Sequence, residues 1–204
     1  LPSDNGYVTT SVTSAVVGGD VSFDFYRDEG YTLKSVKING VEKFDGVTGE
    51  DKVIFDGTKF KYSTTMVENG FVVQAEFKRI ALPVALSAAC SATVGDHIYV
   101  FGGSLESMDT ATSIYDINTL SGQVELLDTH FETSAASMSC VAYQTHIYIF
   151  GGYHWTGTDT DELNTIYDFD TETKTFVTHD PALPNLSIPT RNMACSISGS
   201  NILL

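Results

Sequence analysis

The second half of the chain contains an internal repeat, and this repeat constrains the fold more than any other feature. His97–Gly103 (HIYVFGG) recurs as His146–Gly152 (HIYIFGG), an offset of 49 positions, 151 minus 102. Ser113–Thr119 (SIYDINT) recurs as Thr165–Thr171 (TIYDFDT), and a third copy begins with Cys195–Leu204. An apolar run that ends in paired glycines is typical of a strand followed by a sharp turn. The pattern predicts successive β-sheet units of about 50 residues each.

A repeat of this length, with a strand closed by two glycines, resembles the kelch repeat, the four-stranded antiparallel blade of a β-propeller. The resemblance covers residues 81–204 and implies two blades and the start of a third. Phe176 stands where the family has a tryptophan, and the family's Pro-x-Arg lead-in is kept as Pro189–Arg191. The glycines that the resemblance assigns to the turns are Gly102, Gly103, Gly151 and Gly152.

Charge separates the first 80 residues from the rest. They hold nine of the eleven basic residues and 12 acidic ones, a net charge of -3, so the remaining residues carry -12 of the total -15. This break predicts a domain boundary at Ala81–Pro83. Polar and apolar residues alternate in Val21–Phe25, Leu33–Ile38 and Phe71–Phe77, which predicts strands with one buried face.

The first 80 residues resemble a divergent internalin-type B repeat, a module of bacterial secreted and surface proteins. The likeness lies in Asp28–Tyr31 (DEGY), Ser35–Val41 (SVKINGV) and Ala75–Phe77 (AEF), with residues 44–61 as an insertion. It implies a small β-grasp-like domain, so the whole chain is expected to be all-β, with a minor helix left open in this module. It also implies that the protein is secreted or lies on the bacterial cell surface.

Composition excludes several classes of partner. With a net charge of -15, the chain lacks the basic surface that nucleic acids and anionic membranes require. Its apolar runs are far shorter than the roughly 20 residues of a membrane-spanning helix, so no membrane span is expected. The start, Leu1–Asp4, has no basic and then apolar run, and we expect the chain to begin inside a longer gene product.

The three cysteines occupy one place in successive repeats. Cys90, Cys140 and Cys195 precede Ile98, Ile147 and Ile202 of the repeated run by 8, 7 and 7 residues, and they have small or apolar neighbours. They are interpreted as buried free thiols of successive strands, with metal ligation or a catalytic thiolate as the alternatives. His97 and His146 also recur with the repeat, which favours a structural role for both.

One loop of the second repeat breaks the repeat pattern and is the candidate binding site. It contains the only tryptophan of the chain. Aromatic faces can stack on sugar rings while histidine and aspartate bond hydroxyl groups, so the loop suits a saccharide or protein ligand. The alternatives are a loop that packs on the next blade and a Ca²⁺ site, although the EF-hand ligand pattern is missing. The candidate residues are Tyr153, His154, Trp155, Asp159 and Asp161.

No nucleophile, zinc or phosphate-binding motif is present, so no catalytic residue, metal ligand or cofactor is predicted. The leading hypothesis is a binding or adhesion module of a bacterial secreted or surface kelch protein that recognises a carbohydrate or a protein. An alternative is a fragment of a carbohydrate-active kelch enzyme, of the oxidase or sugar mutarotase type, whose catalytic residues lie in other blades. A third is self-association of several chains through the open edges of a partial propeller.

Overall fold

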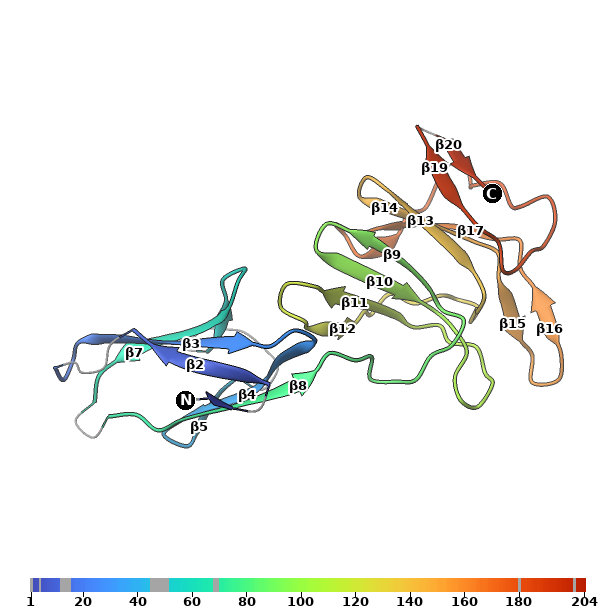
Figure 1. The fold of residues 1–204 in the computed structure, drawn as a ribbon. Coiled ribbons are helices and arrows are strands. Elements are labelled where there is room, and N and C mark those ends of the chain that lie inside the picture. Colours follow the sequence, from blue (N-terminus) through green and yellow to red (C-terminus); the bar gives the residue numbers. More distant parts are fainter. Residues whose placement is uncertain are drawn as a thin grey trace. The chain divides into compact units, whose positions relative to one another are not determined.

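The computed structural model describes residues 2–3, 5–11, 16–44, 52–67, 70–179, 181–199 and 201–204 (Figure 1). These residues form β-strands and connecting turns, and they contain no helix. The all-β fold class is therefore confirmed, and the minor helix left open for the first module is absent from this part of the chain. Two compact units emerge, one of Leu1–Ala81 with Thr119–Gln123, the other of Leu82–Asn118 with Val124–Leu204.

The first unit contains two antiparallel sheets with a shared core. Alternation in β3 (Asp20–Arg27) buries Val21, Phe23 and Phe25, as its sequence predicts. These side chains pack with Leu33 of β4, so burial of one face of each sheet stabilises the unit. One sheet has the order β1 (Pro2–Ser3), β2 (Gly6–Thr10), β3, β7 (Phe60–Thr65), β6 (Ile54–Phe55), and the other has β5 (Val41–Phe44), β4 (Tyr31–Ile38), β8 (Val73–Arg79).

The turn between β4 and β5 has the predicted chemistry. Asn39 and Gly40 both have positive φ, 50° and 80°, the conformation of the tight hairpin turns that this residue pair favours. Of the insertion expected at residues 44–61, residues 45–51 lie outside the described part, and the rest contributes β6 and the start of β7.

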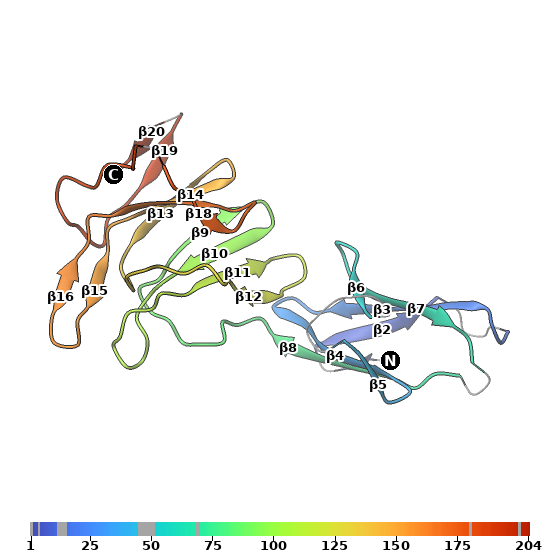
Figure 2. The same ribbon diagram turned by 180° about the vertical axis from the view of Figure 1, so that it is seen from behind.

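The second unit contains two complete four-stranded antiparallel sheets, seen from the opposite sides in Figures 1 and 2. Their strands follow the repeat. The two copies of the glycine-ended run form β10 (His97–Phe101) and β14 (His146–Phe150). A two-stranded hairpin, β19 (Ser196–Ser198) and β20 (Asn201–Leu203), begins the third copy. The first sheet is β9 (Cys90–Val94), β10 (His97–Phe101), β11 (Ile114–Asn118), β12 (Val124–Leu126), and the second is β13 (Ser139–Tyr143), β14 (His146–Phe150), β17 (Ile166–Asp170), β18 (Thr175–Phe176).

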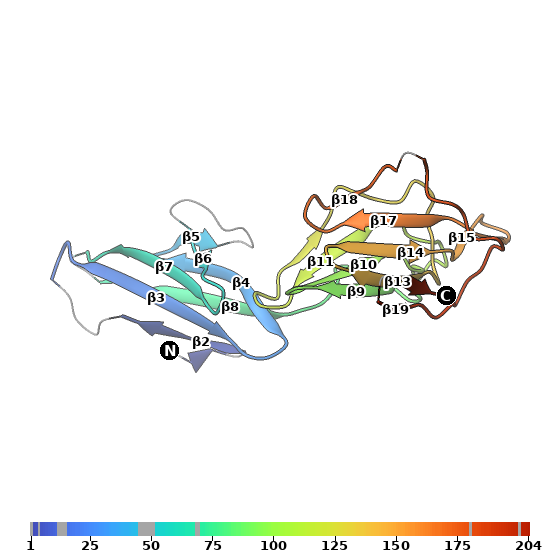
Figure 3. The ribbon, with the colours of Figure 1, turned by 90° about the horizontal axis from the view of Figure 1, so that it is seen from above.

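The core of the second unit lies between these two sheets, which run side by side in Figure 3. Phe101 of the first sheet meets Phe169 of the second edge to face, with ring centroids 5.4 Å apart. Phe176 packs on Phe169 at 5.7 Å and on Phe131 at 5.1 Å. A phenyl ring at the family's tryptophan position thus still fills the space between blades.

The paired glycines fix the lead-in of each following repeat. Gly103 N–H donates to the carbonyl of Ala135, and Gly152 N–H donates to the carbonyl of Thr190, both at 2.8 Å. Gly151 has φ +59°, and a Cβ there would collide with the Thr190 carbonyl oxygen. Only glycine therefore tolerates both the backbone conformation and the close approach of the next repeat.

Charged side chains join the two blades. Lys174, from the β17–β18 turn, contacts the buried carboxylate of Asp116 at 2.9 Å and Glu125 at 2.6 Å. Burial lowers the pKa of Lys174, but its hydrogen bonds to Glu125 and Asp116 outweigh this effect and raise that pKa to about 12. Each of the two recurring histidines contacts an aspartate of its own sheet. His97 Nδ1 lies 2.6 Å from Asp116 Oδ1, and His146 Nδ1 lies 2.7 Å from Asp168 Oδ1.

Candidate functional site

The predicted binding loop is a β-hairpin. β15 (Tyr153–Trp155) pairs with β16 (Thr160–Glu162) in antiparallel register, so the polar loop expected from the sequence is ordered by strand pairing. Side chains alternate between the two faces of a hairpin, which places Tyr153 and Trp155 together and His154 opposite them. Because of this alternation, the five predicted residues cannot all lie on one face of the hairpin.

Tyr153 and Trp155 line a cavity of about 360 Å³. This volume is at the small end of ligand pockets and suits one large side chain or a single sugar. Residues of three repeats meet here, because the cavity also takes side chains from the loop after β10 and from the lead-in of the third repeat. The other lining residues are Ser87, Ser104, Leu105, Met108, Thr160 and Arg191.

Arg191 is the basic group of this cavity. Its guanidinium lies 5.2 Å from the centroid of the Tyr153 ring and 3.3 Å from a carboxylate oxygen of Glu162. The Tyr153 hydroxyl is 2.9 Å from Ser104 Oγ. Ser104 thus contacts the hydroxyl of the tyrosine, and Arg191 contacts the face of its ring. From the sequence, Arg191 is expected only as part of a lead-in motif. The sequence does contain a signal that singles out Arg191, since Arg191 and Lys174 are the only lysine or arginine residues after position 80.

His154 does not line the cavity. Its Nδ1 is 3.0 Å from Ser134 Oγ and 3.1 Å from the Ser134 carbonyl oxygen, on the other face of the hairpin. The neighbouring Trp155 N–H donates to Thr110 Oγ1 at 3.2 Å. These bonds attach the hairpin to the preceding repeat, so His154 has a positioning role for the two aromatic residues.

The two predicted aspartates also lie outside the cavity lining. Asp159 is exposed in the hairpin turn, where its Oδ1 accepts the Thr160 N–H at 2.8 Å. Asp161 is exposed and stands opposite His154 in the strand register, on the face away from Trp155. The structure thus brings together Tyr153 and Trp155 but not His154, Asp159 and Asp161.

The interpretation of the cysteines as buried free thiols of successive strands is confirmed for Cys90 and only in part for the other two, because Cys140 and Cys195 are half-buried and Cys195 lies outside a strand. Cys90 in β9 is buried, Cys140 in β13 is half-buried, Cys195 directly precedes β19, and all three are free thiols. A hydrogen bond with Cys140, together with burial, raises the pKa of the Cys90 thiol above its ordinary value of 9.0. Among the described residues, no group of three histidine, cysteine or acidic side chains is placed to hold a metal ion.

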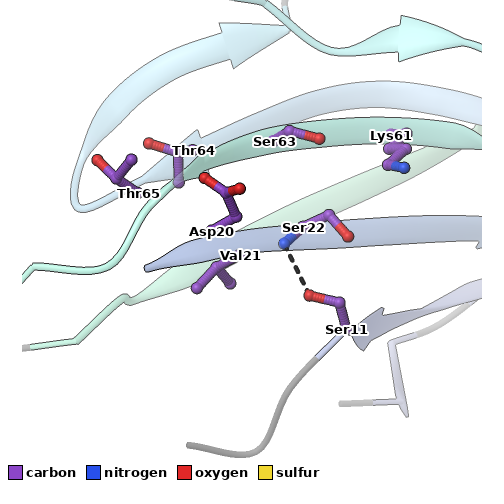
Figure 4. A pocket seen from close by; sticks show the side chains of 8 residues that line it. All are labelled: Ser11, Asp20, Val21, Ser22, Lys61, Ser63, Thr64 and Thr65. Carbon is purple, nitrogen blue, oxygen red and sulfur yellow. Dashed lines mark hydrogen bonds between the residues drawn. The ribbon is translucent and has the colours of Figure 1, made fainter. Parts of the chain in front are cut away.

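Two other cavities have a different character. One of about 510 Å³ lies on the first unit, where β3 and β7 present mainly hydroxyl groups together with Asp20 and Lys61 (Figure 4). Another of about 510 Å³ lies beside β17 and β18, where His179 Nε2 is 2.9 Å from Asp168 Oδ2. Neither contains a residue predicted to bind, and neither pairs tryptophan with arginine.

Two successive antiparallel four-stranded sheets, each with a glycine-closed second strand, define a β-propeller type of module in the second unit. Residues 134–178, which include the second sheet and the β15–β16 hairpin, match the kelch motif, and this match supports a kelch repeat here. None of the curated proteins matches the chain. The family match does not reach residues 1–80, whose likeness to the internalin-type B repeat stays a prediction. No described segment forms a helix long and apolar enough to cross a membrane.

Proposed function

We propose that the second unit binds a protein partner, and that the cavity beside Tyr153 and Trp155 receives a side chain of that partner. Kelch repeats generally mediate protein interactions, and the match at residues 134–178 suggests a module of this kind. The observation that carries the proposal is the meeting of Trp155, Tyr153 and Arg191 in one cavity. Tryptophan, tyrosine and arginine are the residues that most often dominate binding energy at protein interfaces.

The neighbours of Trp155 favour a peptide side chain over a sugar. Leu105 and Met108 line the same cavity as the tryptophan, and Met108 is 70% exposed. Exposed methionine adapts to differently shaped apolar groups and is enriched at interfaces. The histidine and the aspartate that the sequence predicts to bond sugar hydroxyls, His154 and Asp161, belong to the opposite face, so that predicted set is not assembled at this cavity.

A bacterial surface location for this binding function rests on the sequence likeness of residues 1–80. In that setting the first unit would serve as a spacer or adhesive element, and the second would make the specific contact. Carbohydrate recognition and an enzyme that acts on sugars are the competing functions. Both would use a saccharide instead of a peptide as the ligand, and this difference makes them testable.

The test is a selection with the full chain against a phage-displayed library of random dodecapeptides, in parallel with a glycan array. Affinities of the selected peptides are then measured for the parent protein, for Trp155→Ala and for Leu126→Ala. Leu126 is 58% exposed on β12 and does not line the cavity, so its truncation controls for a general loss of exposed apolar surface. Thermal unfolding of each variant checks that it folds.

We expect Trp155→Ala to weaken the selected peptides about 30-fold, the effect of losing a central interface tryptophan. Leu126→Ala should stay within about twofold of the parent. Glycans that bind the parent protein and lose binding in Trp155→Ala, with no peptide selected, would replace the protein partner by a carbohydrate. Peptides that bind both variants equally would remove the cavity as the site.

A further inference from the structure

Exposed carboxylates stand next to lining residues of the cavity along the chain. Glu106 and Asp109 lie in the loop that also carries the lining residues Leu105 and Met108, and Asp159 lies in the β15–β16 turn. All three side chains are exposed. Glu106, Asp109 and Asp159 are called the acidic rim below.

The basic residues of this half of the chain are engaged with other carboxylates. Lys174 is held at the blade seam by Asp116 and Glu125, and Arg191 pairs with Glu162. Arg191, the basic side chain of the cavity, thus already has a counter-charge in Glu162, and the acidic rim adds negative charge to the loops that carry the lining residues. Residues 81–204 have a net charge of -12, whose potential adds to that of the acidic rim at low salt.

Arg191 also shows that an aromatic ring of this cavity binds a cation. A guanidinium over the Tyr153 ring is a cation–π contact, and its charge is balanced by a carboxylate at the edge of the ring. Trp155 offers a larger aromatic face, which binds cations better than tyrosine does. The acidic rim could balance a second cation there as Glu162 balances Arg191.

We propose that the cavity receives an arginine or lysine side chain from a basic segment of the protein partner. The aliphatic stem of that side chain lies along Leu105 and Met108, and its charged head lies between the Trp155 ring and the acidic rim. This inference rests on the proposed function and adds the charge of the partner to it. An acidic segment would instead meet the rim and the charge of the whole unit with repulsion.

The test uses synthetic probes on the full chain. A fluorescein-labelled peptide of alternating glycine and arginine is compared with its citrulline counterpart, which has the same shape without the charge. The protein is prepared as Glu106→Gln/Asp109→Asn and as the control Asp128→Asn/Glu172→Gln. Both double variants remove two exposed carboxylates from the second unit, but Asp128 and Glu172 lie in segments that contribute no lining residue to this cavity. Fluorescence anisotropy gives the affinities at two salt concentrations.

We expect the arginine peptide to bind at least tenfold tighter than the citrulline peptide. The rim variant should lose at least fivefold for the arginine peptide, since two close charge pairs are weakened, and the control should change less than twofold. Equal losses in rim and control variants would show general charge attraction and overturn the inference, as would equal binding of the two peptides.

Failure of this inference is distinguishable from failure of the proposed function. If the library selects peptides without basic residues, and Trp155→Ala weakens them, the cavity binds protein but the basic partner is wrong. If Trp155→Ala leaves every selected peptide and the arginine probe unchanged, the proposed function itself fails.

Discussion

The guanidinium of Arg191 lies over the ring of Tyr153, 5.2 Å from its centroid, and this contact joins the third repeat to the second. Gly152 makes it possible, because its N–H holds the carbonyl of Thr190, the residue next to Arg191. The cavity beside Tyr153 and Trp155 is thus a product of the repeat itself. It forms where the lead-in of one repeat docks on the glycine turn of the previous one. The first two repeats have Leu86 and Ala136 where Arg191 stands.

Gly151→Ala should destabilise the second unit far more than Gly95→Ala. Both glycines have nearly the same φ, +59° and +57°, so the cost of a left-handed alanine is shared. A Cβ at Gly151 would meet the Thr190 carbonyl, whereas nothing lies within 4 Å of a Cβ at Gly95. We expect the difference in unfolding free energy, measured by urea denaturation, to be about 2 kcal/mol or more. Equal effects would mean that the repeat docking tolerates a side chain there.

Lys174→Met should weaken the seam between the blades. Its ammonium group bridges Asp116 and Glu125 but is about one third exposed, so solvent screening reduces the loss to about 1 kcal/mol. The folded-state pKa of Lys174, about 12, is above its ordinary value of 10.5. A raised lysine pKa gives stability that is complete below 10.5 and is lost as pH rises through 12.

The pH dependence of this variant therefore has a defined sign. The difference in unfolding free energy between the parent and Lys174→Met should be constant from pH 7 to pH 9.5 and should shrink toward pH 12. Urea denaturation at several pH values measures it. A difference that disappears already at pH 8 would contradict the ion pairs seen at the seam.

The cysteines should resist thiol reagents in the folded protein. The pKa of Cys90 is raised by its hydrogen bond to Cys140 and by burial, and the pKa of Cys195 is raised first by burial. Thiolate is the reactive form, so both react slowly at pH 8. We expect Ellman's reagent to modify these two thiols at least about tenfold faster after unfolding in guanidinium chloride. Rapid modification of all three thiols in the native protein would contradict the burial of Cys90 and the partial burial of Cys195.

Much of the fold was predictable because repeats and alternation are local patterns. The run that ends at Gly102 and Gly103 became β10, its copy became β14, and Asn39-Gly40 became a hairpin turn. The candidate site was only partly predictable. Tyr153 and Trp155 share the cavity, but Met108 and Arg191 come from other repeats, and their approach depends on how repeats dock.

His154 lies apart from the two aromatic residues for a different reason. The segment from Tyr153 to Glu162 was interpreted as a loop, in which neighbouring residues can point in one direction. Strand pairing imposes a period of two, so His154 faces Ser134 while Trp155 faces the cavity. An alternating interpretation of Tyr153-His154-Trp155 would have separated these residues.

Trp155 itself provides the most direct test of the central claim, because it is the only tryptophan of the chain and its emission reports on the cavity alone. A peptide selected on the full chain, free of tryptophan, is titrated while the intrinsic emission is recorded and the affinity is measured independently by calorimetry. If the partner occupies this cavity, the Trp155 emission changes and saturates at the same peptide concentration as the heat of binding. Unchanged emission at full saturation would place the partner elsewhere and rule out the cavity as its site.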